Sequence, residues 1–379
     1  MEKYIKSEDC IIHEQEEDEG GIGYYLLSQI QGTVLQVNPT IITFIGLLET
    51  ARSEEELIDC IDGEMDEAGR EQIVSFLKAL HKLGVIRKAS DPPLPKRVFR
   101  FQKGEQIGPY TVVEGITVRR WTQLYKVRQG EQQQPFVLKL FNYSPQEQST
   151  DLIQEMLERF RAEFEIMAQL QHPNICTLYE FYAGEYPYGV MEYIEGVSLR
   201  DQLESTATLA EAEQMIEQML AAFAYLHEKE ILHGDIHYLN VLVDQQQQVK
   251  VIDFGFSYEQ EHLGDENAWH AGLSHFIPPE RTADHSFRLS KGMGGTRSEV
   301  FQLGVMIYYI ITKQYPFTGE LWEDLREAIR SQALSGVPSA YVQSLSPARE
   351  AILLRALAKT PDDRYADASA LLAAWSQSL

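Results

Sequence analysis

The segment His233–Asn240 restricts most strongly what this chain can fold into. It reads His-Gly-Asp-Ile-His-Tyr-Leu-Asn, and a short hydrophobic stretch separates it from an Ile-Asp-Phe-Gly segment that contains Asp253. The first Asp, Asp235, can accept the proton of an attacking hydroxyl, so it is the predicted general base. Asn240 and Asp253 supply an amide and a carboxylate, the hard oxygen donors that suit Mg²⁺, and are the predicted metal ligands. Phosphoryl transfer from ATP requires these groups in this order.

A Lys–Glu pair upstream extends the pattern. Lys139 lies in the apolar run Phe136–Leu140, which predicts a strand, and Glu163 lies nine residues before a His-Pro-Asn-Ile segment. Together with the two loop motifs, these segments resemble the eukaryotic-type (Hanks-type) protein kinase family. The resemblance implies ATP and Mg²⁺ as cofactors, with Lys139 on the α- and β-phosphates and Glu163 as its helix partner. Glu165 is an alternative partner whose spacing fits less well.

The segment Gly189–Gly196 resembles the hinge between the two lobes of a kinase. The residues that the resemblance places around adenine are Glu192 and Ile194 through their backbones, Met191 behind the ring, and Val137 and Leu242 on its two faces. The resemblance also pairs Glu280, in a Pro-Pro-Glu segment, with Arg364. It places Glu299 where the family has an Asp that braces the catalytic-loop backbone.

The sequence departs from the family pattern at the glycine-rich loop. Thr117, Arg119 and Thr122 stand where glycines are expected, and only Gly115 lies nearby. Glycines allow backbone N–H groups to approach phosphates closely. Either an arginine such as Arg119 binds the phosphates instead, or this strand pair holds ATP weakly.

Further departures concern the catalytic loop and the segment that follows it. Gly234 replaces the Arg that usually precedes the catalytic Asp, and no Lys or Arg occurs between Phe256 and Glu280. We therefore expect activity that does not require prior phosphorylation. His237 replaces a Lys and Leu273 replaces a Thr, which leaves His237 as the candidate donor to the γ-phosphate. The loop also resembles that of small-molecule phosphotransferases of the aminoglycoside type.

The first 90 or so residues form a separate pattern of strands and helices. The predicted elements are strands at Tyr24–Gln29 and Thr33–Val37 around the turn Gln31-Gly32, helices at Thr40–Ala51, Ser53–Ile61 and Gly69–Leu83, and a strand at Val85–Arg87. Ser53 and Glu56 form a predicted capping box. This order resembles the PqqD-like winged-helix fold, which recognises precursor peptides in ribosomal peptide modification.

The PqqD-like resemblance implies that a leader peptide adds as a strand to the hairpin edge and packs on the third helix. The candidate contacts are Val34, Leu35 and Val37 with Ile73, Phe76 and Leu77, and a core role is the alternative for each. DNA binding, which other winged-helix proteins perform, is not expected, because residues 1–98 carry 19 acidic and 10 basic side chains.

The predicted fold class is α+β, a bilobal kinase-like domain preceded by a small winged-helix domain. The predicted boundaries are 1–88 for the peptide-recognition domain, 89–104 for a proline-rich linker, and 105–379 for the kinase-like domain, with lobes at 105–191 and 195–379. The net charge of −24 argues against nucleic acid and anionic membrane as partners. Three scattered cysteines and the lack of a secretory signal or apolar span predict a cytoplasmic location.

These observations favour an ATP-dependent Ser/Thr kinase that phosphorylates a ribosomally made precursor peptide held by its leader. A separate lyase or cyclase is a possible partner, if the phosphate is later eliminated. A pseudokinase scaffold is the first alternative, favoured by the lost glycines, His237 and Leu273. A small-molecule phosphotransferase is the second.

Overall fold

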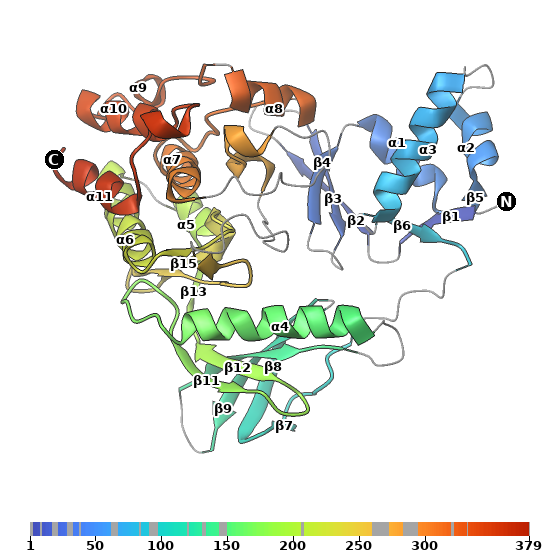
Figure 1. Cartoon of the computed structure of the whole chain (residues 1–379), viewed down its shortest axis with the longest axis horizontal. Coiled ribbons are helices and arrows are strands. Elements are labelled where there is room, and N and C mark those ends of the chain that lie inside the picture. Colours follow the sequence, from blue (N-terminus) through green and yellow to red (C-terminus); the bar gives the residue numbers. More distant parts are fainter. Residues whose placement is uncertain are drawn as a thin grey trace. The chain divides into compact units, whose positions relative to one another are not determined.

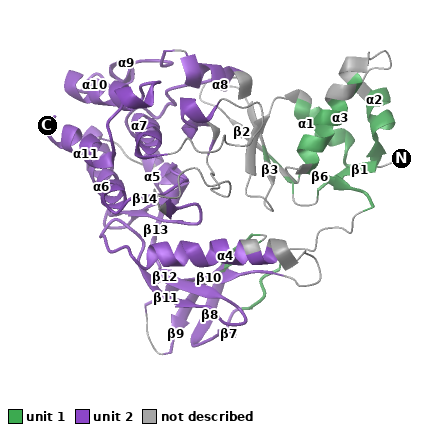
Figure 2. Ribbon diagram, viewed as in Figure 1, with its two compact units in different colours: residues 1–102, 115–123 green, residues 103–114, 124–379 purple. Residues whose placement is uncertain are grey.

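The computed structural model describes sixteen stretches of the chain, between which other residues are left undescribed. They are residues 3–7, 10–16, 22–28, 33–37, 39–61, 67–82, 85–90, 98–119, 121–130, 134–143, 150–205, 208–259, 273–282, 295–319, 322–331 and 333–378. The chain divides into two compact units, residues 1–102 with 115–123, and residues 103–114 with 124–379 (Figure 2). The tip of one hairpin, residues 115–123, is therefore grouped with the first unit, whereas the predicted boundaries assigned it to the kinase-like domain.

The N-terminal part contains two small antiparallel sheets and three helices (Figure 1). The strands are β1 (Lys3–Lys6), β2 (Cys10–Glu16), β3 (Ile22–Ser28), β4 (Thr33–Val37), β5 (Arg52–Ser53) and β6 (Ile86–Lys88). The helices are α1 (Pro39–Leu47), α2 (Glu54–Ile61) and α3 (Glu67–Lys82). The sheets have the orders β2-β3-β4 and β5-β1-β6.

The predicted hairpin forms between β3 and β4, with Leu26 opposite Leu35. Strand β2, whose end is acidic, pairs along the other side of β3, and the sequence analysis did not predict it as a strand. Strand β4 consequently lies at an edge, with one neighbour among the described strands. The predicted turn at Gln31-Gly32 lies outside the described residues.

Local signals explain how α2 begins and how the N-terminal core forms. The predicted capping box is present, since Ser53 N–H donates to Glu56 Oε2 at 2.7 Å and Glu56 N–H donates to Ser53 Oγ at 3.2 Å. The core gathers apolar side chains from both sheets and all three helices. Its buried members are Tyr4, Cys10, Leu26, Phe44, Ile45, Leu48, Leu57, Leu77, Leu80, Val85 and Ile86.

The small lobe is a six-stranded sheet with one long helix. The strands are β7 (Gln106–Ile107), β8 (Tyr110–Val118), β9 (Thr122–Gln129), β10 (Phe136–Phe141), β11 (Leu178–Tyr182) and β12 (Tyr188–Glu192), in the order β11-β12-β10-β9-β8-β7. Helix α4 (Thr150–Met167) buries Phe160, Phe164 and Met167 at helical spacing. It packs against β11, where Phe164 stacks on Phe181 with ring centroids 5.1 Å apart.

The large lobe is mainly helical and carries the catalytic loop on short strands. Its helices are α5 (Leu199–Ser205), α6 (Leu209–Glu228), α7 (Thr296–Thr312), α8 (Trp322–Ser331), α9 (Pro338–Tyr341), α10 (Pro347–Ala356) and α11 (Ala368–Ser376). Its strands are β13 (Gly196–Ser198), β14 (Ile231–Leu232), β15 (Val241–Asp244), β16 (Val249–Val251) and β17 (Tyr258–Glu259). Its short 3-10 helices are η1 (Tyr238–Asn240), η3 (Ser274–Phe276), η4 (Pro279–Arg281) and η5 (Pro361–Asp363).

Helix α7 is buried along almost its whole length and forms the centre of the large lobe. Helices α6, α10 and α11 pack around it (Figure 1). Within the described part of the chain, none of the helices combines the length and apolar character needed to cross a bilayer.

Candidate active site

The Lys–Glu pair that the sequence spacing predicts forms in the small lobe. On β10, Leu138 and Leu140 are buried while Val137 and Lys139 are partly exposed, because alternate residues of a strand face opposite sides. Nζ of Lys139 lies 2.6 and 2.8 Å from the two carboxylate oxygens of Glu163 on α4. The side chains are 12% and 4% exposed, so water screens this pair far less than a surface ion pair.

The same lysine reaches the large lobe. Its Nζ lies 3.4 Å from Oδ1 of Asp253, so the ammonium group sits between the two carboxylates. Asp253 has a φ of 63°, a left-handed conformation that is uncommon outside glycine. Glu165, the alternative partner of Lys139, is exposed, and the lysine pairs with Glu163 instead.

Asp235 and Asn240 are joined by hydrogen bonds in the loop that leads from β14 to β15. Nδ2 of Asn240 donates to Oδ2 and to the backbone oxygen of Asp235, each at 3.0 Å. Because the amide nitrogen is used in this way, the amide oxygen of Asn240 is the atom that can ligate a cation. Oδ1 of Asp235 is buried and accepts no hydrogen bond. Such an oxygen is costly until a ligand pairs with it, and a substrate hydroxyl would do so.

His237 lies beside this unpaired oxygen. Its Nδ1 accepts the N–H of Leu239 at 3.2 Å, so a neutral ring carries its proton on Nε2. Both hydrogens of Asn240 Nδ2 are already donated to Asp235, so Nε2, although 3.2 Å away, does not accept from Asn240. Nε2 lies 3.3 Å from Oδ1 of Asp235 without hydrogen-bond geometry. The imidazole therefore presents an N–H next to the predicted general base.

A buried network fixes the backbone immediately before Asp235. Oε1 of Glu299 on α7 accepts the N–H of Gly234 at 2.8 Å, and Oε2 lies 2.8 Å from Nε2 of His227 on α6. Nδ1 of His227 accepts the N–H of Ala368 at 3.0 Å, so its Nε2 carries the proton and donates to Glu299. Burial alone would raise the pKa of Glu299, but the hydrogen bonds from His227 and Gly234 hold it below its usual value.

Glu299 thus reaches the catalytic-loop backbone despite its extra methylene. His227 could not be recognised from the sequence, because a single His on a helix belongs to no motif. Its role depends on a contact between residues 141 positions apart.

Gly234 has a backbone reason to be glycine. Its φ is +78°, and a Cβ built there would lie 2.2 Å from the carbonyl oxygen of Phe256. In the sequence, Gly234 is notable only as the replacement of a cationic residue. The structure adds that a side chain there would be both strained and sterically blocked.

The three apolar side chains predicted to contact adenine are all partly exposed. They are Val137, Met191 and Leu242. Val137 and Met191 lie directly opposite each other on β10 and β12. Their strand neighbours Leu138, Val190, Val241 and Val243 are buried. The accessible apolar positions are thus those that a flat ring would cover.

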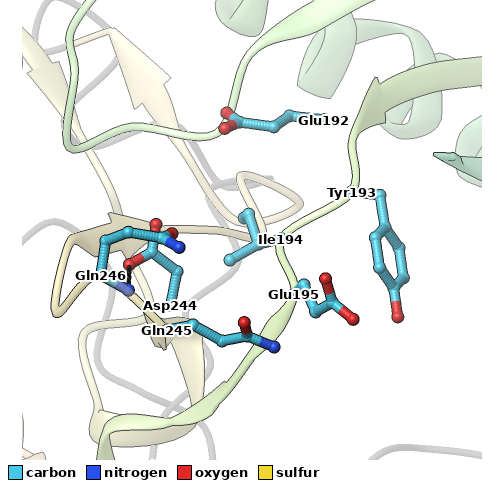
Figure 3. Close-up of a pocket in the computed structure, with 7 residues that line it drawn as sticks. All are labelled: Glu192, Tyr193, Ile194, Glu195, Asp244, Gln245 and Gln246. Carbon is cyan, nitrogen blue, oxygen red and sulfur yellow. Dashed lines mark hydrogen bonds between the residues drawn. The ribbon is translucent and has the colours of Figure 1, made fainter. Parts of the chain in front are cut away.

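A polar pocket of about 200 Å³ lies at the hinge, between residues 192–195 and the β15–β16 turn (Figure 3). It includes Glu192 and Ile194, but its opposite wall is Asp244, Gln245 and Gln246. It is therefore not the predicted adenine site, whose other members do not line it. Lys250, which does not line the pocket, forms an ion pair with Glu192, with its Nζ 2.8 Å from Oε1.

Glu280 and Arg364 form the predicted ion pair. Two guanidinium nitrogens of Arg364 donate to the two oxygens of Glu280 at 2.9 and 2.7 Å, and Arg364 is 1% exposed. This bidentate geometry is the strong form of the contact. Burial opposes ionisation of Glu280, but Arg364 and the hydroxyl of Ser298 hold its pKa below its usual value.

The predicted peptide contacts divide into three groups. Leu77 is fully buried and belongs to the core, so the proposal that it contacts peptide is not supported in this structure. Ile73 and Phe76 pack on the core but remain partly exposed. For Val34, Leu35 and Val37 the backbone of β4 is described, whereas their side chains lie outside the described residues.

The residues present fit a Mg²⁺–nucleotide ligand. Among the described residues, no group of three or more His, Cys, Asp and Glu side chains gathers as a metal centre would. Mg²⁺ does not need such a group, since it keeps several waters and binds one or two protein oxygens with the phosphates. The Asn240 amide oxygen and the Asp253 carboxylate are suitable donors, and Asp235 supplies the unpaired base oxygen.

The bilobal fold defines the class of protein. A lysine held by a helix carboxylate on one lobe and an Asp–Asn loop on the other belong to kinase-like phosphotransferases. The family model described as the protein kinase domain matches residues 120–376, which is more than half of the chain. The chain therefore belongs to the protein kinase family, and this membership implies the use of ATP and Mg²⁺.

Several curated bacterial kinases are similar to the chain. Serine/threonine-protein kinase PknB of Mycobacterium tuberculosis (strain ATCC 25618 / H37Rv) is 33% identical over 226 residues, covering 57% of this chain and 35% of the relative. Serine/threonine-protein kinase PrkC of Bacillus subtilis (strain 168) is 31% identical over 221 residues, covering 56% and 32%. The chain thus matches about a third of the length of these relatives. Their similarity supports a protein Ser/Thr kinase.

Proposed function

We propose that this protein is an ATP- and Mg²⁺-dependent Ser/Thr kinase that phosphorylates a ribosomally made precursor peptide. The N-terminal domain holds the leader of that peptide, and the kinase domain acts on hydroxyls in its core. The observation that carries the catalytic part is the buried, unpaired Oδ1 of Asp235, whose other carboxylate oxygen accepts from Asn240, in the same compact unit as the Lys139–Glu163 pair.

In this mechanism Asp235 accepts the proton of the substrate hydroxyl as that oxygen bonds to the γ-phosphorus, while the bond from the γ-phosphorus to the β,γ-bridging oxygen breaks and ADP leaves. Lys139 neutralises the α- and β-phosphates, and Glu163 orients its ammonium group. Asn240 and Asp253 hold Mg²⁺, which supplies charge neutralisation at the phosphates when bound. The N–H on Nε2 of His237 donates to the γ-phosphate, in the place that the family gives to a Lys.

The peptide part of the proposal depends on the N-terminal sheet. Strand β4 is an edge strand among the described residues, so its outer N–H and C=O groups can pair with an added strand. Ile73 and Phe76 of α3 retain exposed surface for the peptide side chains. Tethering the leader raises the concentration of core hydroxyls at Asp235, because the second encounter becomes intramolecular. The phosphate is then kept, or it leaves in elimination by a separate lyase or cyclase.

A pseudokinase scaffold is the competing function. The lack of glycines at Thr117, Arg119 and Thr122 favours it, since those residues hinder close backbone approach to phosphates. A small-molecule phosphotransferase is disfavoured by the Glu280–Arg364 pair and by the protein kinases among the relatives.

The test of transfer is ³²P incorporation from Mg²⁺-ATP into peptides encoded beside the gene. Asp235→Asn keeps the shape of the side chain and removes the base, so labelling should fall by at least about 10²-fold. Asp363→Asn, at an exposed position, is the matched control and should retain the wild-type rate. Wild-type protein that binds nucleotide yet labels no such peptide would favour the scaffold.

The test of leader binding uses Pro at Val34 and at Leu35. Neighbouring residues of a strand point their N–H groups to opposite sides, so one of the two substitutions removes an outward N–H of β4. That variant should bind the leader at least about tenfold more weakly by fluorescence anisotropy, equivalent to about 1.4 kcal/mol, with nucleotide affinity unchanged. Unchanged leader affinity in both variants would exclude strand addition at β4.

A further inference from the structure

The hairpin formed by β8 and β9 stands where kinases carry the glycine-rich loop, and its one glycine has another use here. A Cβ built on Gly115 would lie 2.4 to 2.6 Å from three ring atoms of Phe99. The ring of Phe99 is therefore seated directly against the backbone of β8. The ring occupies the side of Gly115 from which a side chain would project, although Gly115 is otherwise exposed.

The segment that carries Phe99 is fastened to β9 as well. Oε1 of Gln123 accepts the N–H of Arg100 at 2.9 Å, and Nε2 of Gln123 donates to the carbonyl of Val98 at 3.3 Å. These two backbone groups flank Phe99, so one side-chain amide holds the segment on both sides of the ring. Gln123 is 2% exposed, so these hydrogen bonds lie in a buried setting where water competes little for the amide.

Two further hydrogen bonds make the arrangement compact. Nε2 of Gln102 donates to the carbonyl of Phe99 at 3.1 Å, which folds the segment back on itself. The N–H of Arg119 donates to the carbonyl of Thr122 at 2.7 Å and closes the tip of the hairpin. Val98, by contrast, is 64% exposed, so its side chain takes little part in this packing.

We propose that Phe99 and Gln123 are positioning residues for nucleotide binding: they clamp the β8–β9 hairpin in one conformation, which offsets part of the affinity lost with the missing glycines. This inference rests on the proposed kinase function. A flexible hairpin must lose conformational entropy when it closes on phosphates, whereas a clamped hairpin has lost it already. Phe99 lies before residues 120–376, so the family match does not include it. The clamp also joins the hairpin to the chain that follows the N-terminal domain.

The experiment compares full-length variants by hydrogen exchange and by binding of Mg²⁺ with a non-hydrolysable ATP analogue. Phe99→Ala removes the ring that packs on Gly115, and Gly115→Ala pushes that ring away. Gln123→Leu removes both hydrogen bonds from the Gln123 amide to the segment around Phe99. Each variant should exchange amide hydrogens of residues 115–119 faster. Each should bind the analogue about tenfold more weakly, which corresponds to about 1.4 kcal/mol. The control Val98→Ala, at an exposed side chain, should change neither quantity.

Two features separate positioning from general destabilisation. The Phe99→Ala and Gly115→Ala effects should not add in the double variant, because both act through one contact. KM for ATP should rise while kcat stays within about twofold, whereas damage to the catalytic loop would lower kcat. Thermal unfolding of each variant reports whether the fold is retained.

The outcomes are distinct. Wild-type exchange and affinity in a folded Phe99→Ala variant would overturn the clamp. Faster exchange of the hairpin with unchanged analogue affinity would overturn its role in nucleotide binding. If wild-type protein binds no nucleotide at all, both this role and the proposed ATP chemistry fail. If it binds nucleotide but transfers no phosphate, only the proposed kinase function fails, because the affinity measurement still tests the clamp.

Discussion

Gly234 offers a test of how the catalytic loop is held. We consider Gly234→Ala, with Gly130→Ala as the matched control. Both glycines have positive φ, +78° and +54°, but a Cβ at Gly130 meets nothing within 4 Å. The control therefore measures the cost of the left-handed conformation alone, about 1–2 kcal/mol.

At Gly234 the added Cβ would also lie 2.2 Å from the carbonyl oxygen of Phe256. Relief to a contact of about 3.4 Å requires the backbone to move by about 1 Å, and Asp235 is the next residue. Misplacement of a catalytic group by about 1 Å can lower the rate about 10²-fold, or about 2.7 kcal/mol in activation free energy. Gly234→Arg, which restores the usual family residue, should be at least as damaging.

The assay pairs phosphotransfer rate with urea unfolding. We expect Gly234→Ala to lose about 10²-fold in kcat and more stability than Gly130→Ala, whose kcat should be nearly unchanged. A Gly234→Ala protein as active and as stable as the control would refute the claim that this position requires glycine. An active Gly234→Arg protein would refute it equally.

Two further predictions concern acid stability and control. The pKa values of Glu280 and Glu299 lie below their ordinary value of 4.5. The stability that these two carboxylates contribute is therefore present above pH 4.5 and is lost as the pH falls through their folded-state pKa values. The loss is at most about 1.4 kcal/mol per pH unit for each group. Urea midpoints between pH 6 and 3 should show this loss, with a smaller slope in Glu280→Gln. Phosphatase-treated protein should keep its transfer rate, because Gly234 offers no cation to a phosphorylated loop; a large loss would contradict this.

The sequence was sufficient where function depends on a fixed order of residues. Lys139 meets Glu163, and Glu280 meets Arg364, as the resemblance to protein kinases implies. Local signals likewise located the capping box of α2 and the β3–β4 hairpin.

The sequence was insufficient where a role arises from packing between distant segments. His227 acquires its role through Ala368, and Gly115 acquires its role through Phe99. Strand β1 joins its sheet by pairing with β5, where Lys3 lies opposite Ser53. No local sequence pattern predicts this pairing. Strand β2 was not predicted for a similar reason. Its end is acidic and lacks a clear alternation of apolar and polar residues, and it forms a strand because it pairs with β3.

The hydrogen bond from Ala368 to His227 has a consequence for the timing of synthesis. The backbone of the catalytic loop reaches its final support only after residue 368 has left the ribosome and α11 has docked. The N-terminal core, complete by Ile86, is available about 280 residues earlier, or on the order of 15–60 s at typical rates of translation. A nascent chain therefore folds its N-terminal domain first and completes the support of its catalytic loop last.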